Sequence, residues 1–181
     1  MHIEDQEFPK RCGHLDGKTL VSQSAMVKKI KTASENKLSD NFILIARTDA
    51  RGVDGLEAAI DRGNCYRDAG ADMIFPEGLR SEEEFIQFAE QCPGLLLANM
   101  TEFGKTPHIT AEQFGTFGYN LVIYPVTFQR VAMGAVTRCL EQLHADQSAE
   151  GFESQMQSRQ ELYDLLGYIP GEAWAFPTTQ R

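Results

Sequence analysis

The sequence has little that would suit a membrane or a nucleic acid. Lys and Arg number 17 against 26 Asp and Glu, so the formal net charge is −9. This excess of negative charge disfavours nucleic acids and anionic membrane surfaces as partners. No apolar run approaches the ~20 residues of a membrane-spanning helix, and the N-terminus lacks the basic-then-apolar layout of a signal peptide. We expect a cytoplasmic protein without membrane or nucleic-acid partners.

Cysteine is scarce, and common cofactor motifs are missing. The cysteines at 12, 65, 92 and 139 are widely separated, with no Cys-x-x-Cys pair. This spacing argues against a zinc site and gives no disulfide framework. No Gly-x-Gly-x-x-Gly and no phosphate-loop motif follows any apolar run, which disfavours a nucleotide-binding sheet. With 181 residues, 42% hydrophobic and 24% charged, the chain has the composition of one ordinary globular domain.

A short apolar run, a polar tip, a turn and an amphipathic helix recur along the chain. The runs lie at residues 1–6, 42–46, 73–75, 95–98 and 121–123. Continuous apolar runs that alternate with helices indicate a parallel sheet covered by helices. Polar residues follow each run, at the edge where barrels and open sheets place their active sites. We predict an α/β fold of the (β/α)₈ TIM-barrel type that is incomplete, because such barrels usually need ~250 residues.

The pattern also predicts how the chain is divided. Residues 1–147 would form a partial barrel of about five strand–helix units, with a long helix whose apolar stripe spans 128–143. Residues 148–181 would form a C-terminal helix over about 152–166, then an irregular arm with Trp174 and Pro177. This second part would belong to the same domain or dock on a neighbouring subunit.

The segment Lys10-Arg11-Cys12-Gly13-His14 carries the strongest chemical signal. Two cations and an imidazole beside a thiol favour its thiolate form. Gly13 allows the backbone to approach a ligand closely. His14 could donate a hydrogen bond to a substrate or tune Cys12. The alternative is a basic surface loop in which the cysteine is incidental.

Polar residues at the tips of the apolar runs are the other candidates. Arg47 would clamp a carboxylate with two hydrogen bonds, or pair structurally with Asp49 or a nearby glutamate. Glu77 could hold Arg47 or a metal-bound water, or simply be solvated. Asn99 and Thr101 offer neutral hydrogen bonds, although both types are common in turns. These readings remain open on the residues alone.

Charged residues near the two ends of the chain are harder to place. Glu4 and Asp5 are adjacent, so a strand turns them to opposite faces and only one enters a barrel. Arg130 opens a helix, where a cation opposes the helix dipole and hints at a use. Arg159 lies on the last helix, where a solvated charge is the default.

Seven segments together resemble the isocitrate lyase/phosphoenolpyruvate mutase superfamily, and within it the branch that cleaves 2-methylisocitrate. They are residues 2–6, 10–14, 46–50, 75–77, 98–107, 124–127 and 156–163. The resemblance implies a Mg²⁺-dependent carbon–carbon lyase, with Mn²⁺ as an alternative ion. It would split a small tricarboxylate into pyruvate and succinate in the 2-methylcitrate cycle of propionate catabolism. It also implies a homotetramer in which the C-terminal helix is exchanged between subunits.

The resemblance also implies roles for individual residues. Cys12 would be the general acid, with Lys10 and His14 as further catalytic residues. Glu4 would help hold the metal through water. The implied substrate contacts are Cys12, Gly13, His14, Arg47, Glu77, Asn99, Met100, Thr101, Arg130 and Arg159.

Members of this superfamily carry upstream barrel strands, and this chain begins at what would be the fourth. The direct metal ligands would lie in that missing part, so we expect the chain to be inactive alone. Three alternatives stay open: a phosphonomutase or oxaloacetate decarboxylase on the same scaffold, a non-catalytic remnant acting only in oligomer assembly, and a Cys-His hydrolase. The hydrolase is the weakest, because no Asn or Asp is evidently placed to orient His14.

Overall fold

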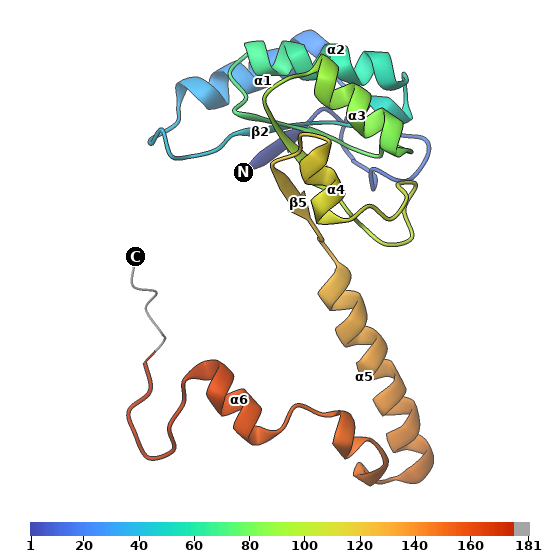
Figure 1. Ribbon diagram of the computed structural model, residues 1–181, viewed down its shortest axis with the longest axis vertical. Coiled ribbons are helices and arrows are strands. Elements are labelled where there is room, and N and C mark those ends of the chain that lie inside the picture. The colour runs from blue at the N-terminus through green and yellow to red at the C-terminus, as the bar shows by residue number, and fades with distance from the viewer. Residues whose placement is uncertain (176–181) are drawn as a thin grey trace. The chain divides into compact units, whose positions relative to one another are not determined.

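The computed structural model describes residues 1–175, which form two compact units, Met1–Thr127 and the part from Phe128 onward. The first unit holds a five-stranded sheet (Figure 1). Its strands are β1 (His2–Glu4), β2 (Ile45–Thr48), β3 (Met73–Pro76), β4 (Leu95–Asn99) and β5 (Leu121–Ile123). All neighbours are parallel and follow chain order. The predicted parallel sheet of five strands is confirmed. Among the described residues β1 and β5 remain its edges.

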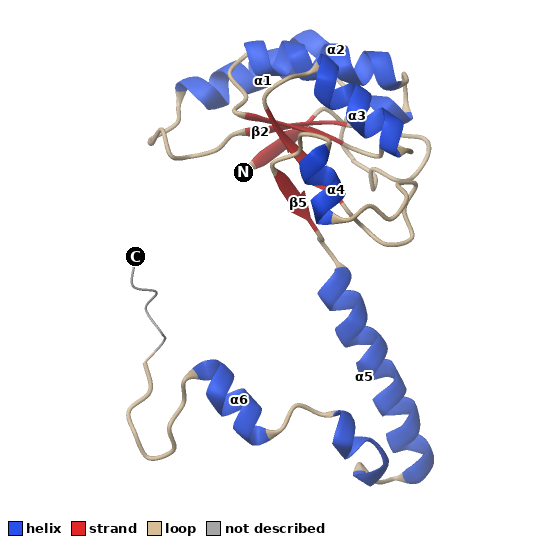
Figure 2. Ribbon diagram, viewed as in Figure 1, coloured by secondary structure: helices blue, strands red, loops and turns tan. Residues whose placement is uncertain are grey.

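Helices connect the strands of the first unit. They are α1 (Gln23–Glu35), the 3₁₀ turn η1 (Ala50–Gly52), α2 (Leu56–Asp68), α3 (Glu82–Gln91) and α4 (Ala111–Thr116). Ser22, Ser81 and Thr110 cap α1, α3 and α4, because each side-chain oxygen accepts an amide three residues on. Figure 2 shows α1, α2 and α3 on one face of the sheet.

The two faces of the sheet have different cores. Ala46, Ile74 and Leu96 point toward the helices and join the large core cluster. Phe75 and Leu97 point the other way and belong to a small separate cluster. This alternation follows from the two-residue period of a strand. The face with the small cluster therefore has room for polar side chains.

Strand register brings polar groups together on that second face. Glu4 of β1 is paired with Arg47 of β2, and Arg47 with Phe75 of β3. Asp5, one residue beyond Glu4, is fully buried among groups of the helix side. The expectation that Glu4 and Asp5 face opposite ways is confirmed, and Glu4 is the one on the face of Arg47.

The second unit comprises α5 (Thr127–Asp146, whose first residue belongs to the first unit), the 3₁₀ segment η2 (Glu150–Gln155) and α6 (Arg159–Leu166). A continuous helix over 152–166 is therefore wrong. Met156 is extended, and Ser158 starts a new helix through a capping box with Glu161. Serine and glutamate three residues apart favour a helix start over continuation.

Other features of the second unit bear on its surface. The predicted apolar stripe of α5 is present, yet none of its residues is buried in the described chain. Within the arm, the Trp174 indole donates to the Leu166 carbonyl at 2.9 Å; Pro177 lies outside the described residues. None of the described helices has the length and apolarity needed to cross a membrane. The division at residue 147 stays a prediction.

Candidate active site

A loop of residues 7–19, which we call the flap, follows β1 and contains the Lys10–His14 segment. Its two ends are joined by an antiparallel bridge between Gln6 and Leu20. The Gln6 side-chain amide exchanges two hydrogen bonds with the backbone of Arg11, each 2.9 Å long. The base of the flap is therefore fixed by backbone pairing and by a buried amide.

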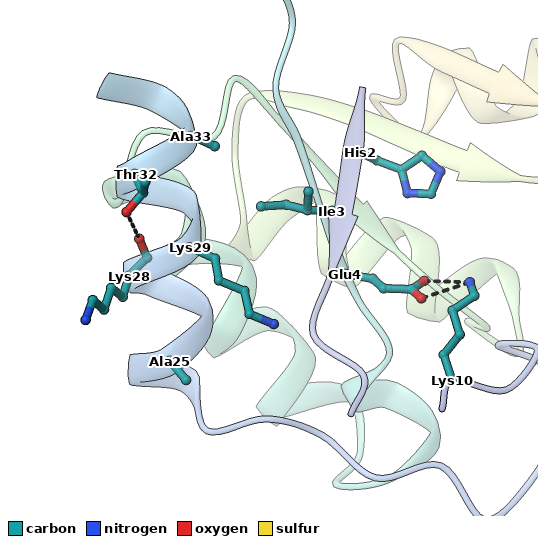
Figure 3. Close-up of a pocket in the computed structure, with 9 residues that line it drawn as sticks. All are labelled: His2, Ile3, Glu4, Lys10, Ala25, Lys28, Lys29, Thr32 and Ala33. Atoms are coloured by element: carbon teal, nitrogen blue, oxygen red, sulfur yellow. Dashed lines mark hydrogen bonds and ion pairs between the residues drawn. The ribbon is translucent and has the colours of Figure 1, made fainter. Parts of the chain in front are cut away.

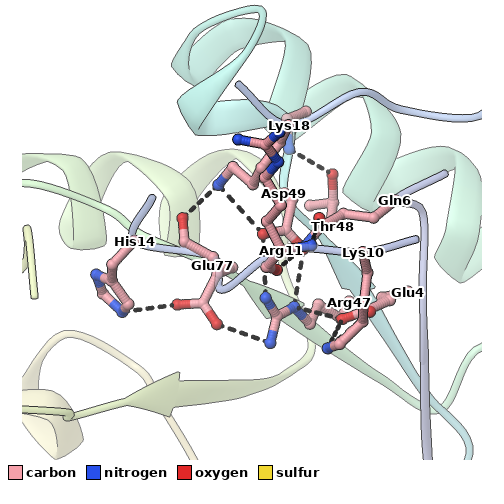
Figure 4. Close-up of polar contacts among 12 residues, drawn as sticks. Glu4, Gln6, Lys10, Arg11, His14, Lys18, Arg47, Thr48, Asp49 and Glu77 are labelled. Carbon is pink, nitrogen blue, oxygen red and sulfur yellow. Dashed lines mark hydrogen bonds and ion pairs between the residues drawn. The ribbon is translucent and has the colours of Figure 1, made fainter. Parts of the chain in front are cut away.

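Arg47 is the centre of the site beneath the flap (Figure 4). Its Nε and Nη2 donate to the two oxygens of Asp49 at 2.8 and 3.0 Å. Its Nη1 lies 2.9 Å from Glu77 Oε2, and its Nε lies 3.2 Å from Glu4 Oε2. The guanidinium also lies over the Phe75 ring, 5.1 Å from the centroid. Both structural partners considered for Arg47, Asp49 and a nearby glutamate, are present.

Burial and neighbouring charges shift the pKa values of Arg47 and Asp49 in opposite directions. Burial raises the pKa of the Asp49 carboxyl, but the Arg47 hydrogen bonds and the charges of Arg47 and Lys18 outweigh it, so the pKa lies below its usual value. For Arg47, burial lowers the pKa, and the Asp49 hydrogen bond with the charges of Glu77, Asp49 and Glu4 raises it overall. Both groups therefore remain charged at neutral pH.

His14 seats the tip of the flap on the loop that follows β4. The Lys105 amide donates to His14 Nδ1 at 3.0 Å, so Nδ1 is the unprotonated nitrogen in this arrangement. The proton-bearing Nε2 lies 3.1 Å from Glu77 Oε1, without the alignment of a hydrogen bond. Gly104 makes the fit possible, since a Cβ there would lie 2.7 Å from Nδ1. A direct influence of His14 on Cys12 stays a prediction.

Gly13 brings the flap backbone onto the site. A Cβ at this position would overlap Glu77 Cγ and lie 2.6 Å from Arg47 Nη2. Gly13→Ala should therefore lift the flap and lower the free energy of unfolding by about 1–3 kcal/mol, as overpacking does. Urea unfolding measures this change.

Gly115→Ala is the matched control for that substitution. Gly115 lies in α4, and a Cβ there meets nothing within 4 Å. Removing a helical glycine should raise stability by about 0.5–1 kcal/mol. If Gly13→Ala is as stable as this control, the close approach of the flap is wrong.

Of the remaining predicted residues of the first unit, some lie on the flap or in contact with Glu4 and Glu77, and Met100 lies in the core. Lys10 pairs with Glu4 at 2.8 Å, and Cys12 is exposed on the flap. Asn99 donates to both oxygens of Glu77 at 3.3 Å, while its own Oδ1 is buried without a hydrogen-bond partner among the described residues. Met100 instead lies in the core, where its sulfur accepts the Ile109 amide.

Thr101 is buried directly after Met100. Arg130 and Arg159 belong to the second unit, Arg130 on α5 and Arg159 at the start of α6. The first unit thus gathers Glu4, Lys10, Gly13, His14, Arg47, Glu77 and Asn99 into one network. The roles of all these residues in substrate binding stay predictions.

Two members of the network were missed by sequence reasoning. Lys18 is 7% exposed and lies between the flap backbone and Asp49. Gln6 holds the flap base. Lys18 had no sequence signal, because a lysine between Gly17 and Thr19 looks like an ordinary surface-loop residue. Gln6 lies in the segment 2–6 of the resemblance, but nothing in the sequence pointed to its contact with Arg11.

Asp5 supports the site from the helix side of the sheet. It accepts the Thr48 hydroxyl at 2.8 Å, the Asp49 amide at 2.9 Å, the Tyr66 hydroxyl at 2.8 Å and Arg62 at 3.2 Å. These four donors compensate a fully buried carboxylate. Asp5 thereby fixes the backbone at Asp49, on which Arg47 depends.

A set of direct metal ligands is not present in residues 1–175. No group of three or more His, Cys, Asp or Glu side chains there is arranged to hold an ion. The carboxylate of Glu4 is already engaged by Lys10 and Arg47. The described residues therefore do not fit a Mg²⁺ ion by direct coordination.

A pocket lies beside this network, at the edge of β1 (Figure 3). It has a volume of about 900 Å³ and is lined by His2, Ile3 and Glu4 of β1, by Lys10, and by residues of α1. A strand edge with unpaired backbone groups is where a further strand would add. Glu4 and Lys10 belong both to the lining of this pocket and to the Arg47 network, so the two adjoin one another.

Comparisons with known proteins agree on one family. The family model for phosphoenolpyruvate phosphomutase matches residues 1–144. The Corynebacterium glutamicum protein named "Probable 2-methylisocitrate lyase 1" is 52% identical over 168 residues, covering 92% of this chain and 55% of that protein. The 2-methylisocitrate lyase of Bacillus subtilis is 50% identical over 175 residues, covering 96% and 57%.

A solved structure agrees with the sequence matches. The crystal structure of 2,3-dimethylmalate lyase, a PEP mutase/isocitrate lyase superfamily member, superposes with a TM-score of 0.83 at 37% identity, over 92% of this chain and 56% of that one. The chain therefore spans a little over half the length of these relatives, and its five strands are part of their barrel. It belongs to the phosphoenolpyruvate mutase/isocitrate lyase superfamily as a homologue of the 2-methylisocitrate lyases.

Proposed function

We propose that this chain supplies the flap and general-acid part of an active site that cleaves 2-methylisocitrate into pyruvate and succinate. The observation that carries the proposal is the position of the flap: the loop bearing Cys12 lies over Arg47 and Glu77, at the carboxyl ends of β2 and β3. Relatives about half identical to the chain bear the name of this activity.

The chemistry needs an acid on a closing loop. When the C2–C3 bond breaks, the C2 hydroxyl gives its proton to a general base, and its oxygen becomes the pyruvate carbonyl. The bonding electron pair stays on C3 and is delocalised into a carboxylate of the succinate half. A proton must then reach C3, and a neutral Cys12 thiol can donate it as a general acid. In this role Cys12 is not an attacking nucleophile.

The charged side chains of the site nearly cancel, so an anionic substrate would need additional positive charge there. Lys10, Lys18 and Arg47 pair with Glu4, Asp49 and Glu77, three cations against three carboxylates. A tricarboxylate would bring up to three further negative charges. Arg130 and Arg159 are the proposed sources within the chain, and Asn99 Oδ1 would accept a substrate hydroxyl or a water.

A divalent ion is the other source of positive charge. We assign Mg²⁺, or Mn²⁺ in its place, to the assembled enzyme, where it would stabilise charge that develops on the substrate. Glu4 would contact the ion through water, and the direct ligands would come from residues that this chain does not provide. The assembly we propose is a homotetramer in which the C-terminal helix is exchanged between subunits.

The proposal predicts that the 181-residue chain alone has no lyase activity. One polypeptide joining the chain to the parts of the C. glutamicum relative outside the matched span should release pyruvate from 2-methylisocitrate with Mg²⁺, whereas the chain alone should stay at background. A coupled pyruvate assay measures both. Turnover by the chain alone would show that it needs no further strands.

Other substrates test the alternatives in the same assay. If the joined protein acts on oxaloacetate or phosphonopyruvate but not on 2-methylisocitrate, the proposed substrate is wrong. If it acts on none of them although the full relative is active, the chain is a non-catalytic remnant.

A further inference from the structure

We propose that Lys18 is a positioning residue that latches the flap closed and, through Asp49, couples closure to the orientation of Arg47. The inference rests on the proposed function for its catalytic consequence, but its structural part stands on contacts within the first unit.

Lys18 and Asp49 are buried together. The Lys18 side chain is 2% exposed, and that of Asp49 is fully buried. A buried ammonium is costly unless it is paired and hydrogen-bonded. Lys18 Nζ donates to the Gly13 carbonyl and lies 3.2 Å from Asp49 Oδ1. One ammonium thus bridges the flap tip to the end of β2.

A glycine leaves space for the Lys18 ammonium. Gly52, in the 3₁₀ turn η1, lies directly against it. A Cβ at Gly52 would be 2.8 Å from Lys18 Nζ and 3.2 Å from Cε. An exposed lysine that only formed an ion pair would not need a glycine packed against its ammonium. The glycine permits an approach that a side chain would block.

Lys18 and Arg47 share the carboxylate of Asp49. Asp49 Oδ1 accepts from Lys18 Nζ and from Arg47 Nη2, and Asp49 Oδ2 accepts from Arg47 Nε. If the flap opens and carries Lys18 away from Asp49, Asp49 loses one of its two cationic partners. The hydrogen bonds that orient Arg47 then change with the flap. A single carboxylate links loop closure to the guanidinium beneath it.

The latch can be measured without activity, because the Lys105 amide donates to His14 and is protected only while the flap is seated. In Lys18→Met, hydrogen exchange at Lys105 should speed up by about tenfold or more, as local opening does. Exchange at Met100, whose amide donates to the Ile123 carbonyl, should stay unchanged. Lys37→Met, which removes a partly exposed ion pair with Asp72, is the matched control and should leave both amides as they are.

Gly52→Ala is the second variant, used because it keeps every charge. It should push Lys18 aside and speed exchange at Lys105 in the same direction by a smaller factor. The latch is wrong if Lys105 exchanges at the wild-type rate in both variants. It is also wrong if Lys105 and Met100 speed up together, since that pattern is general destabilisation.

The kinetic arm separates this inference from the proposed function. In the joined protein, Lys18→Met should lower kcat for pyruvate release by about tenfold or more, because the flap is misplaced, and Lys18→Arg should recover part of it. If the wild-type joined protein releases no pyruvate but Lys105 exchange responds to Lys18, the function is wrong and the latch stands. Normal kcat with unchanged exchange overturns the latch.

Discussion

Replacing Arg47 with methionine should lower the free energy of unfolding by about 3–5 kcal/mol, the cost of removing one partner from a buried ion pair. In residues 1–175, Arg47 forms ion pairs with Glu4, Asp49 and Glu77 together. Its removal leaves the buried carboxylates of Asp49 and Glu77 without the guanidinium that pairs with both of them. Urea unfolding at neutral pH measures the loss.

The pH dependence of that loss follows from Asp49. Burial raises the pKa of this carboxyl, but the hydrogen bonds and charges of Arg47 and Lys18 lower it by more, so the folded pKa lies below the unfolded one. A depressed carboxyl stabilises the fold above its unfolded pKa, about 3.9, and this stabilisation disappears as pH falls through the folded pKa. The gap between wild type and Arg47→Met should therefore be widest near neutral pH and narrow below about pH 4.

Lys10→Met is the control for this substitution. Its side chain is 51% exposed and pairs with Glu4 in the same network. Exposed ion pairs contribute about 0–1 kcal/mol, so this variant should be nearly as stable as wild type. Equal losses in Lys10→Met and Arg47→Met would contradict the central place given to Arg47.

Replacing Cys12 with serine in the joined protein should lower kcat for pyruvate release by about 10²- to 10⁴-fold, the usual contribution of a positioned acid. A hydroxyl is a much weaker acid than a thiol, so proton delivery to C3 slows. Cys12 is exposed, and folding should be unaffected. Steady-state kinetics with saturating 2-methylisocitrate and Mg²⁺ give the measurement.

Cys139→Ser provides the matched thiol control, because Cys139 lies on α5 of the second unit and is not a residue of the flap. This variant should keep wild-type kcat. Unchanged product formation in Cys12→Ser would remove the general-acid role and leave the flap as a structural cover.

Sequence reasoning succeeded where the physics is local. Continuous apolar runs gave the strands, and residues 121–123 match β5 at both ends. The strand period placed Glu4 and Asp5 on opposite faces. Strand tips gave Arg47, Glu77 and Asn99, because parallel strands bring their carboxyl ends to one edge.

Sequence reasoning failed where contacts between distant residues determine the position of a side chain. The burial of Lys18 depends on Asp49 and Gly52, more than 30 residues away in the chain. His14 depends on Lys105, 91 residues away. The break before α6 was missed because apolar spacing continues across it, while the capping box at Ser158 overrides that spacing.

The contacts of Asp5 and His14 have a consequence for the order in which the site forms. Asp5 meets Tyr66, which follows it by 61 residues, and His14 meets Lys105 at a separation of 91. Contacts across such separations cost more loop-closure entropy than local contacts do, and this entropy is lost before the contact is gained. During synthesis, the residues of the flap leave the ribosome before Tyr66 and Lys105, the residues that Asp5 and His14 contact. The cysteine loop is thus made before the residues that hold it in place.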